Sequence, residues 1–354
     1  MVQALGKILP HSSYHFFLKN DRAKTDNLGL NFPNQFHFAG QWQNTSLHTL
    51  FSTQILLAAV FNRPDIIICG HVNFSPLAAK ISNFLNIPYW VIVHGVDVWN
   101  LGNPSKINGL KSANKIISVS QYTGDRLVRE QNISPEQISL LPNTFDKTKF
   151  NITPKPQYLL EKYKLNPDQP IILTIARLAG EERYKGYDQI IQALPEIIKI
   201  IPNIHYVIGG KGGDRPRIEQ LIKDLNLEDY VTLAGFIPDE ELADHYNLCD
   251  VFAMPSKGEG FGIVYLEALA CGKPTIGGNQ DGAIDALCNG ELGVLVNPDD
   301  LTEISTAITQ IIEKTYPLPI LYQPETLRQK VIEIYGFEQF KQNLAQLLSA
   351  QFNQ

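Results

Sequence analysis

Short apolar, β-rich runs alternate with helix-like segments along most of this 354-residue chain. This alternation is typical of βαβ units, and it favours parallel sheets covered by helices on both faces. The runs expected to form strands are residues 65–70, 88–94, 115–120, 171–176, 205–209, 231–235, 250–255, 273–278 and 293–297. Helical patterns are found at 76–86, 187–201, 215–225 and 262–271, and from 301 to the end. The sequence therefore predicts an α/β protein.

A polar stretch interrupts the alternation after Pro142 and contains four prolines, at positions 154, 156, 167 and 170. Such a stretch is typical of a linker, and the chain length suits two domains. We predict two doubly wound, Rossmann-like domains facing a cleft: an N-terminal domain over 1–150 and a second domain over 151–335. A C-terminal helix over 336–354 is expected to return to the N-terminal domain. Ligands bind beyond the carboxyl ends of such strands, so the cleft is the expected active site.

Composition narrows the classes of function. The chain is 44% hydrophobic and 19% charged with a net charge of −6, and it lacks a basic aromatic platform, which excludes nucleic-acid binding. Its four cysteines are scattered, so no disulfide framework or cysteine metal site is expected. No signal peptide or bilayer-spanning run is found, and the protein is expected to be cytoplasmic.

Charge is unevenly distributed along the chain. Residues 1–150 carry a balance of +5, and the remainder carries −11. A basic N-terminal half favours peripheral contact with the anionic inner face of a membrane. An ordinary spread of surface charge explains the same numbers, and both interpretations stay open.

Residues 255–274 carry the densest functional signal: a strand end, a turn with three glycines, and a helix that Gly272 ends. Free N–H groups at the helix start, together with the helix dipole, make an anion site. Two carboxylates flank it, Glu259 in the turn and Glu267 in the helix, and carboxylates suit hydroxyl groups rather than phosphates. The pattern indicates a ligand with phosphates and vicinal diols, such as a nucleotide sugar.

Two cations form a second signal. Arg177 directly follows the first strand of the second domain, and Lys185 precedes the next helix. Cations in these places suit a diphosphate. A surface Arg and Lys paired with Glu181 and Glu182 is an equally good explanation at this stage.

Taken together, these segments resemble the retaining glycosyltransferases of family 4, which have the GT-B fold. The resemblance spans roughly residues 65–300 in the order of the family. Its matching stretches are 94–99, 118–127, 141–150, 176–188, 207–212, 231–242 and 256–274. The most specific of them is the Glu-x7-Glu motif, formed here by Glu259 and Glu267 within E-G-F-G…E-A-x-A-x-G-x-P.

The resemblance implies a role for each matching residue. Arg177 and Lys185 would bind the donor diphosphate, Glu259 the hexose hydroxyls and Glu267 the ribose diol. His94 would approach the transferred sugar, although a strand-end histidine is as often structural as functional. The implied catalytic residues are His94, Arg177, Lys185 and Glu259. The other implied donor contacts are Gly95, Phe236, Ile237, Gly260, Phe261, Gly262 and Ile263, with Phe236 and Ile237 beside the base.

The resemblance also implies the chemistry, a hexosyl transfer from a nucleotide-diphosphate sugar to a glycan or lipid-linked acceptor, as in polysaccharide biosynthesis. Configuration would be retained, because the leaving phosphate oxygen takes the acceptor's proton on the same face. Neither a metal nor another cofactor is expected, and no Asp-x-Asp motif is present. The sequence does not determine the donor base, the hexose or the acceptor.

The sequence departs from the family in two places. Asp285 replaces the usual Glu in the segment after 273–278. At the start, residues 1–10 have a helical pattern and a strand is expected at 14–19, whereas the family opens with a strand and a Gly-rich loop. We therefore expect that first strand and loop to be missing, and an N-terminal half that opens easily and supports poor transfer.

Three other functions are considered. An NAD-linked dehydrogenase is disfavoured, because the loop 209–217 has Arg215 where G-x-G-x-x-G needs its third glycine. Another GT-B enzyme, such as a phosphorylase or a sugar-nucleotide epimerase, stays open. So does a sugar-nucleotide-binding protein without efficient turnover.

Overall fold

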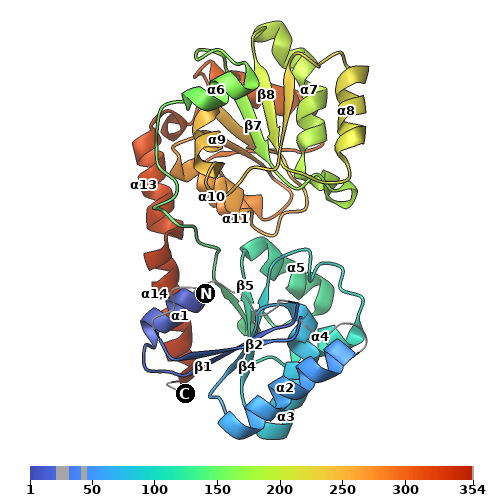
Figure 1. Ribbon diagram of the computed structural model, residues 1–354, viewed down its shortest axis with the longest axis vertical. Helices are drawn as coiled ribbons and strands as arrows, with labels where there is room; N and C mark the ends of the chain where they lie inside the picture. Colours follow the sequence, from blue (N-terminus) through green and yellow to red (C-terminus); the bar gives the residue numbers. More distant parts are fainter. Residues whose placement is uncertain (21–31, 41–45, 353–354) are drawn as a thin grey trace. The chain divides into compact units, whose positions relative to one another are not determined.

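The computed structural model describes residues 1–20, 32–40 and 46–352, and Figure 1 shows its ribbon. The chain divides into two compact units. The N-terminal unit comprises Met1–Val119, Gly124–Leu141 and Phe340–Gln354, and the C-terminal unit comprises Ser120–Thr123 and Pro142–Gln339. Every strand pairing in the described part is parallel. The predicted α/β class is confirmed.

The N-terminal unit contains a four-stranded sheet in the order β3-β4-β5-β6. Its strands are β3 (Ile67–Cys69), β4 (Tyr89–Val93), β5 (Lys115–Ser118) and β6 (Ile138–Leu140). A separate two-stranded sheet pairs β1 (Tyr14–Leu18) with β2 (Asn34–Phe38). The strand expected at 14–19 is thus present, but it lies outside the four-stranded sheet. The expectation of a missing first strand stays a prediction.

Helices in the first half of the chain and at its end accompany these sheets. They are α1 (Val2–Ile8), α2 (Ser46–Asn62), η1 (Val72–Phe74), α3 (Ser75–Leu85), α4 (Pro104–Lys111), α5 (Gln121–Gln131), η2 (Pro135–Gln137) and α14 (Phe337–Phe352). α14 packs into the N-terminal unit through the buried Leu344 and Leu348. Trp90 Nε1 in β4 donates to Gln351 Oε1 of α14 over 3.1 Å. This helix therefore joins the N-terminal unit although it ends the chain.

The C-terminal unit contains a six-stranded sheet in the order β12-β11-β10-β7-β8-β9. Its strands are β7 (Ile171–Ile175), β8 (His205–Gly209), β9 (Val231–Gly235), β10 (Val251–Met254), β11 (Thr275–Gly278) and β12 (Val294–Val296). The first strand, β7, lies centrally. The chain builds outward through β8 and β9, then returns to β10 on the other side of β7. This reversal is a topological switch point, where ligands of doubly wound sheets bind at the carboxyl ends of the strands.

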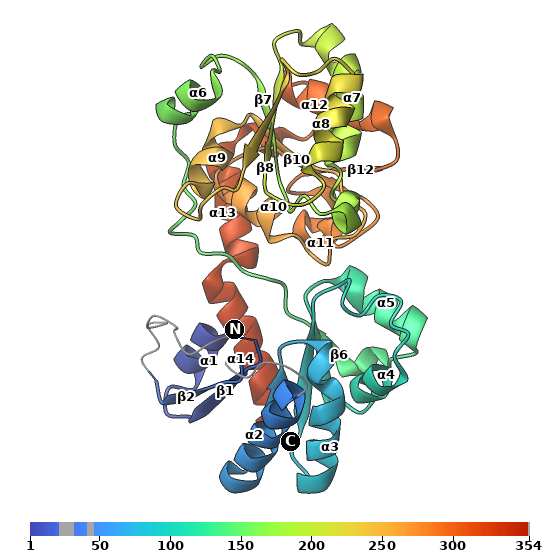
Figure 2. The same ribbon diagram turned by 45° about the vertical axis from the view of Figure 1, so that its right-hand side comes forward.

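Helices cover both faces of this sheet, with α7 and α8 on one face and α9 and α10 on the other (Figures 1 and 2). The helical elements are α6 (Gln157–Tyr163), η3 (Gly180–Lys185), α7 (Tyr187–Ile200), α8 (Arg215–Asp224), α9 (Leu242–Leu248), α10 (Ile263–Ala270), α11 (Ala283–Ala286), η4 (Cys288–Gly290), α12 (Leu301–Ile312), η5 (Pro319–Tyr322) and α13 (Pro324–Tyr335). α7 shows why they pack here. Ile190, Leu194 and Ile197 recur at helical spacing and are fully buried.

Two strands were absent from the sequence expectations, β2 and β6. β6 has only three residues, and β2 reads NQFHF, so neither shows the apolar burst that marked the others. Their pairing depends on a neighbouring strand rather than on their own pattern. Within the described residues, no helix has both the length and the apolar character needed to cross a membrane.

Candidate active site

Two loops of the C-terminal unit meet at the switch point. The loop after β7 carries Arg177 and ends at Lys185, and the loop after β10 begins at Pro255. Gly186 allows them to approach: its φ is 88°, and a Cβ there would lie 2.3 Å from the carbonyl oxygen of Pro255. Any larger residue at this position would push the loops apart.

Lys185 and Glu259 form an ion pair between these two loops, through Nζ and Oε1. Their side chains are only 16% and 12% exposed, so solvent screens the pair weakly. The two residues lie 74 positions apart in the chain. The structure therefore brings together the cation and the carboxylate that the sequence singled out separately.

Arg177 pairs with Glu182 of η3, which was the alternative explanation for this arginine. The Arg177 side chain is 79% exposed, whereas the Glu182 side chain is 11% exposed. The second carboxylate oxygen of Glu182 is buried and has no hydrogen-bond partner within the described part of the chain. Lys185 does not follow the same alternative, because its partner is Glu259 rather than Glu181 or Glu182.

Glu267 lies on α10, and its carboxylate is half-buried. Tyr246 of α9 donates its hydroxyl to Oε2 of Glu267 over 2.7 Å, and Tyr246 is fully buried. Burial raises the pKa of Glu267, and the Tyr246 hydroxyl opposes that rise by stabilising the ionised form. The sequence analysis did not identify Tyr246, because a tyrosine in an apolar helix gives no signal until α9 packs against α10.

The start of α10 has the geometry that the glycine-rich turn predicted. Gly262 caps the helix with a φ of 84°, and no side chain accepts the first N–H groups. Phe261 is buried against the ring of Tyr335, with centroids 5.5 Å apart, whereas Ile263 is exposed. The uncapped N–H groups and the helix dipole favour an anion.

The segment expected beside the base follows β9. Phe236 is 63% exposed, whereas Ile237 is buried. The ammonium of Lys211, from the loop after β8, lies 4.6 Å from the centroid of the Phe236 ring. The sequence analysis did not identify Lys211. An exposed ring and a nearby cation can hold a flat, electron-rich ligand.

Asp285, which replaces the family's Glu, lies half-buried in α11. Gly260 is buried in the loop that also carries Glu259. Across the described residues, no three His, Cys, Asp or Glu side chains cluster closely enough to hold a metal ion. The expectation of a metal-free reaction stays a prediction.

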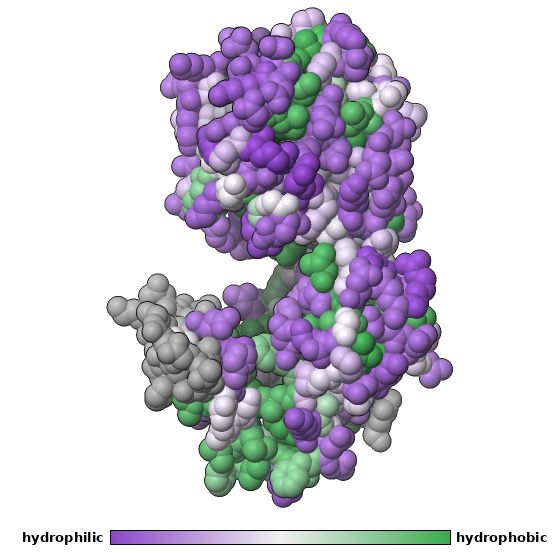
Figure 3. Space-filling view, turned by 90° about the vertical axis from the view of Figure 1, so that its right-hand side faces the viewer, coloured by the Kyte–Doolittle hydropathy of each residue, from purple (hydrophilic) through white to green (hydrophobic). Residues whose placement is uncertain are grey.

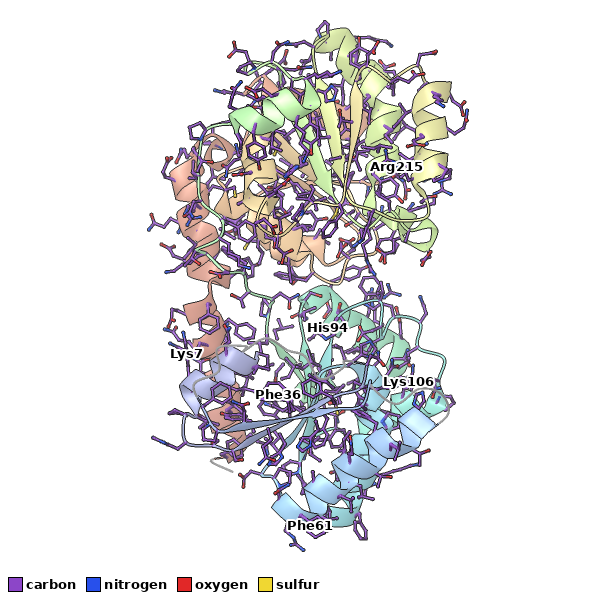
Figure 4. All side chains as sticks on the ribbon, in the orientation of Figure 1. Lys7, Phe36, Phe61, His94, Lys106 and Arg215 are labelled. Carbon is purple, nitrogen blue, oxygen red and sulfur yellow. The ribbon has the colours of Figure 1, made fainter. Side chains whose placement is uncertain are left out.

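His94 belongs to the N-terminal unit, where it follows β4 and is exposed (Figure 4). Its Nε2 lies 2.9 Å from the carbonyl oxygen of Gly70, which can only accept, so Nε2 carries a hydrogen. In the neutral ring, Nδ1 is then the acceptor. The ring centroid of His71, a residue that the sequence analysis missed, lies 6.4 Å away. Gly95 is buried directly after His94.

Residues 158–330 match the family model described as glycosyl transferases group 1, and residues 14–149 match the model of glycosyltransferase family 4. The chain matches glycosyltransferase families in both of its units. These matches agree with the family to which the motifs pointed. They also agree with the assignment of the Glu-x7-Glu stretch to the C-terminal half.

Curated relatives narrow the comparison. The chain is 33% identical over 208 residues to a GDP-mannose-dependent alpha-(1-6)-phosphatidylinositol monomannoside mannosyltransferase of Mycolicibacterium smegmatis, covering 56% of this chain and 53% of that one. It is 24% identical over 303 residues to a phosphatidylinositol N-acetylglucosaminyltransferase of Arabidopsis thaliana, covering 83% and 64%. The match thus spans about half the length of the mycobacterial relative.

Solved structures share the fold. A glycosyltransferase from Rickettsia africae has a TM-score of 0.81 at 20% identity, covering 99% of this chain and 93% of that one. HepE from Anabaena, in complex with UDP and glucose, has a TM-score of 0.79 at 20% identity, covering 99% and 94%. The predicted GT-B class is confirmed, with two α/β units built on parallel sheets.

Proposed function

We propose that this chain transfers a hexose from a nucleotide-diphosphate sugar to a glycan or lipid-linked acceptor. The observation that carries the proposal is the assembly at the switch point of the C-terminal sheet. There, Lys185 meets Glu259, and Tyr246 holds Glu267. The relatives support a nucleotide-sugar donor, since one is named GDP-mannose-dependent and HepE was solved with UDP and glucose.

Each proposed donor contact follows from the chemistry of the group. The exposed guanidinium of Arg177 and the ammonium of Lys185 would bind the diphosphate, exchanging their carboxylate partners for phosphate oxygens. Glu259 would then accept hydroxyl hydrogens of the hexose. Glu267, held by Tyr246, would accept those of the ribose diol.

The remaining donor contacts are proposed on position alone. The backbone of Phe261, Gly262 and Ile263 would offer N–H groups at the start of α10. Phe236 and Ile237 would lie beside the base. The uridine or guanosine identity of that base is left to the experiment below.

The proposed reaction retains configuration and needs no metal. The C1–O bond to the diphosphate breaks as the acceptor oxygen bonds to C1 on the same face, and the acceptor's proton passes to the leaving phosphate oxygen. Positive charge from Arg177, Lys185 and the start of α10 would stabilise the departing diphosphate. His94 is proposed to contact the transferred sugar, with Gly95 beside it.

Peripheral contact with a membrane is a further part of the proposal, because the curated relatives are named for lipid substrates. The lower part of the N-terminal unit presents an apolar surface (Figure 3). Phe61 of α2 and Phe84 of α3 are 80% and 75% exposed, and Leu57 is also exposed. We expect Phe61→Ser to reduce sedimentation with vesicles containing anionic lipid. Equal sedimentation of both proteins would refute this contact.

A panel of UDP, GDP and ADP sugars tests the central proposal. Thermal shift should identify one donor, since a ligand at 100 times its Kd stabilises by about 2.7 kcal/mol. Turnover with that donor and simple acceptors should then yield a product whose anomeric configuration matches the donor. Binding without turnover would favour a binding protein, phosphate-dependent cleavage a phosphorylase, and an altered sugar an epimerase.

A further inference from the structure

Asp281 is a fully buried carboxylate in the turn between β11 and α11. Its Oδ1 accepts the N–H of Ala283 over 2.9 Å, which is an ordinary bond within a turn. Its Oδ2 accepts two further bonds, from Ser256 Oγ over 2.6 Å and from the backbone N–H of Glu259 over 2.7 Å. These two bonds reach a different loop, so the turn alone does not explain them.

The contact with Glu259 is reciprocal. The carbonyl oxygen of Glu259 accepts the N–H of Gly282 over 2.8 Å. Gly282 is required for this approach, because a Cβ there would lie 2.2 Å from the carbonyl oxygen of Gly260. Both backbone polar groups of Glu259 are therefore tied to Asp281 and its neighbour, which fixes the origin of the Glu259 side chain.

The bonds continue to the end of β10. Ser256 Oγ lies 3.0 Å from the hydroxyl of Tyr265, and that hydroxyl donates to the carbonyl oxygen of Met254 over 2.7 Å. All of these groups are buried. A buried carboxylate is costly unless it accepts several hydrogen bonds, and Asp281 accepts three from donors that it holds in place.

We propose that Asp281 is a positioning residue for the transfer reaction: it holds the backbone of Glu259 so that this carboxylate meets Lys185 and the hexose. The inference rests on the proposed function, in which Glu259 contacts the sugar. It assigns Asp281 no contact with the substrate. A displacement of about 1 Å at a reacting group can lower a rate about 100-fold, so the bond to Glu259 carries catalytic weight.

Asp281→Asn is the direct test. The amide has one acceptor oxygen for three donors, so the bond to Glu259 competes with the others. We expect kcat to fall about 10- to 100-fold, whereas the Kd of the nucleoside diphosphate changes less than about threefold, because Glu267 is held by Tyr246 rather than by Asp281. A folded Asp281→Asn protein with wild-type kcat would overturn the inference.

Asp250→Asn is the matched control. Oδ2 of Asp250 accepts the N–H of Ile171 over 2.8 Å and the ammonium of Lys155 over 2.7 Å. Asp250 precedes β10, so it lies at the amino edge of the sheet, opposite the candidate site. We expect this variant to lose thermal stability but to keep kcat. An equal loss of kcat in both variants would reduce Asp281 to a structural role.

Glu259→Ala separates the inference from the proposed function. If Glu259→Ala keeps full turnover, the proposed role of Glu259 is wrong whatever Asp281 does. If Glu259→Ala is impaired and Asp281 acts through it, adding Asp281→Asn should lower kcat little further. Full additivity of the two losses would overturn the inference alone.

The pH profile of the unaltered protein provides a measurement that needs no variant. Burial raises the pKa of Asp281 to about 6, and the nearby Glu259 adds to the rise. Glu259 is itself paired with Lys185, and burial raises the pKa of Tyr184 and Tyr265, which stay protonated. At saturating donor, kcat should fall as pH drops through about 6. A flat kcat between about pH 5 and pH 7 would contradict the positioning role.

Discussion

The two units hold their candidate residues in different ways. In the C-terminal unit, Lys185 and Glu259 sit on loops joined by an ion pair, by the close approach at Gly186 and by the buried Asp281. In the N-terminal unit, His94 is exposed, and its ring bonds to the carbonyl oxygen of Gly70. Preorganised donors act strongly on developing charge, so we infer that the C-terminal unit supplies the catalytic electrostatics. The N-terminal unit offers a more open surface to its ligand.

Lys185→Ala should give the largest effect and tests the C-terminal side of this comparison. Loss of a preorganised cation removes about 2.7–4 kcal/mol of transition-state stabilisation, which is about 100- to 1000-fold in kcat. Steady-state kinetics with saturating donor measures it. Lys162→Ala is the control, because Lys162 pairs with Glu241 at 3.3 Å and both side chains are largely solvated. A loss below about threefold in Lys185→Ala would show that the loops are merely structural.

The two glutamates should separate binding from turnover. Glu267→Ala is expected to weaken the Kd of the free nucleoside diphosphate about 10- to 100-fold, since a hydrogen bond to a charged group contributes about 1.5–3 kcal/mol. Glu259→Ala should leave that Kd nearly unchanged and lower turnover. Isothermal titration with each variant measures the affinities, and steady-state kinetics measures turnover. Equal losses of nucleotide affinity would mean that the division of roles is wrong.

His94→Ala tests the N-terminal side. We expect kcat to fall about 10-fold, the effect of roughly one lost hydrogen bond, with nucleoside diphosphate affinity unchanged within about twofold. The reason is that the proposed nucleotide contacts all belong to the C-terminal unit. Measured Kd and kcat decide it. A large loss of nucleotide affinity would break the comparison between the units.

Tyr246→Phe should have a smaller, pH-dependent effect. The Tyr246 hydroxyl lowers the pKa of Glu267 against the effect of burial, so its removal raises that pKa further. Glu267 is then protonated at higher pH, and nucleotide affinity should fall about 2- to 10-fold near neutrality and more as pH decreases. Tyr206→Phe is the control, since that hydroxyl bonds Thr174 inside the core. Parallel pH profiles of affinity in Tyr246→Phe and the wild type would argue against this role.

Chelation should give the smallest effect. If Arg177 and Lys185 supply the positive charge, EDTA is expected to leave turnover within about twofold. Initial rates before and after chelation measure this. Complete loss that a divalent cation restores would replace the metal-free mechanism and would weaken the special place of the C-terminal cations.

The sequence by itself determined the strands and their ends. Apolar runs and glycine punctuation placed β7 to β12 within two residues of their observed bounds, because periodicity and turn chemistry are local properties. They also placed Arg177 and Lys185 in the β7–α7 connection, and Glu259 beyond the carboxyl end of β10. Loop residues of this kind can be recognised since the strand before them and the helix after them leave their own patterns.

Only the tertiary structure decided which of these residues meet. Strand order places β10 beside β7, and this brings Glu259 to Lys185 across 74 residues of chain. Tyr246 and Asp281 look like an ordinary core tyrosine and a turn aspartate until α9 packs against α10 and the β11 turn reaches Glu259. Local patterns specify which face of an element is buried, but not its neighbour. The neighbour follows from burying all the apolar faces at once, which is a property of the whole sheet and its helices.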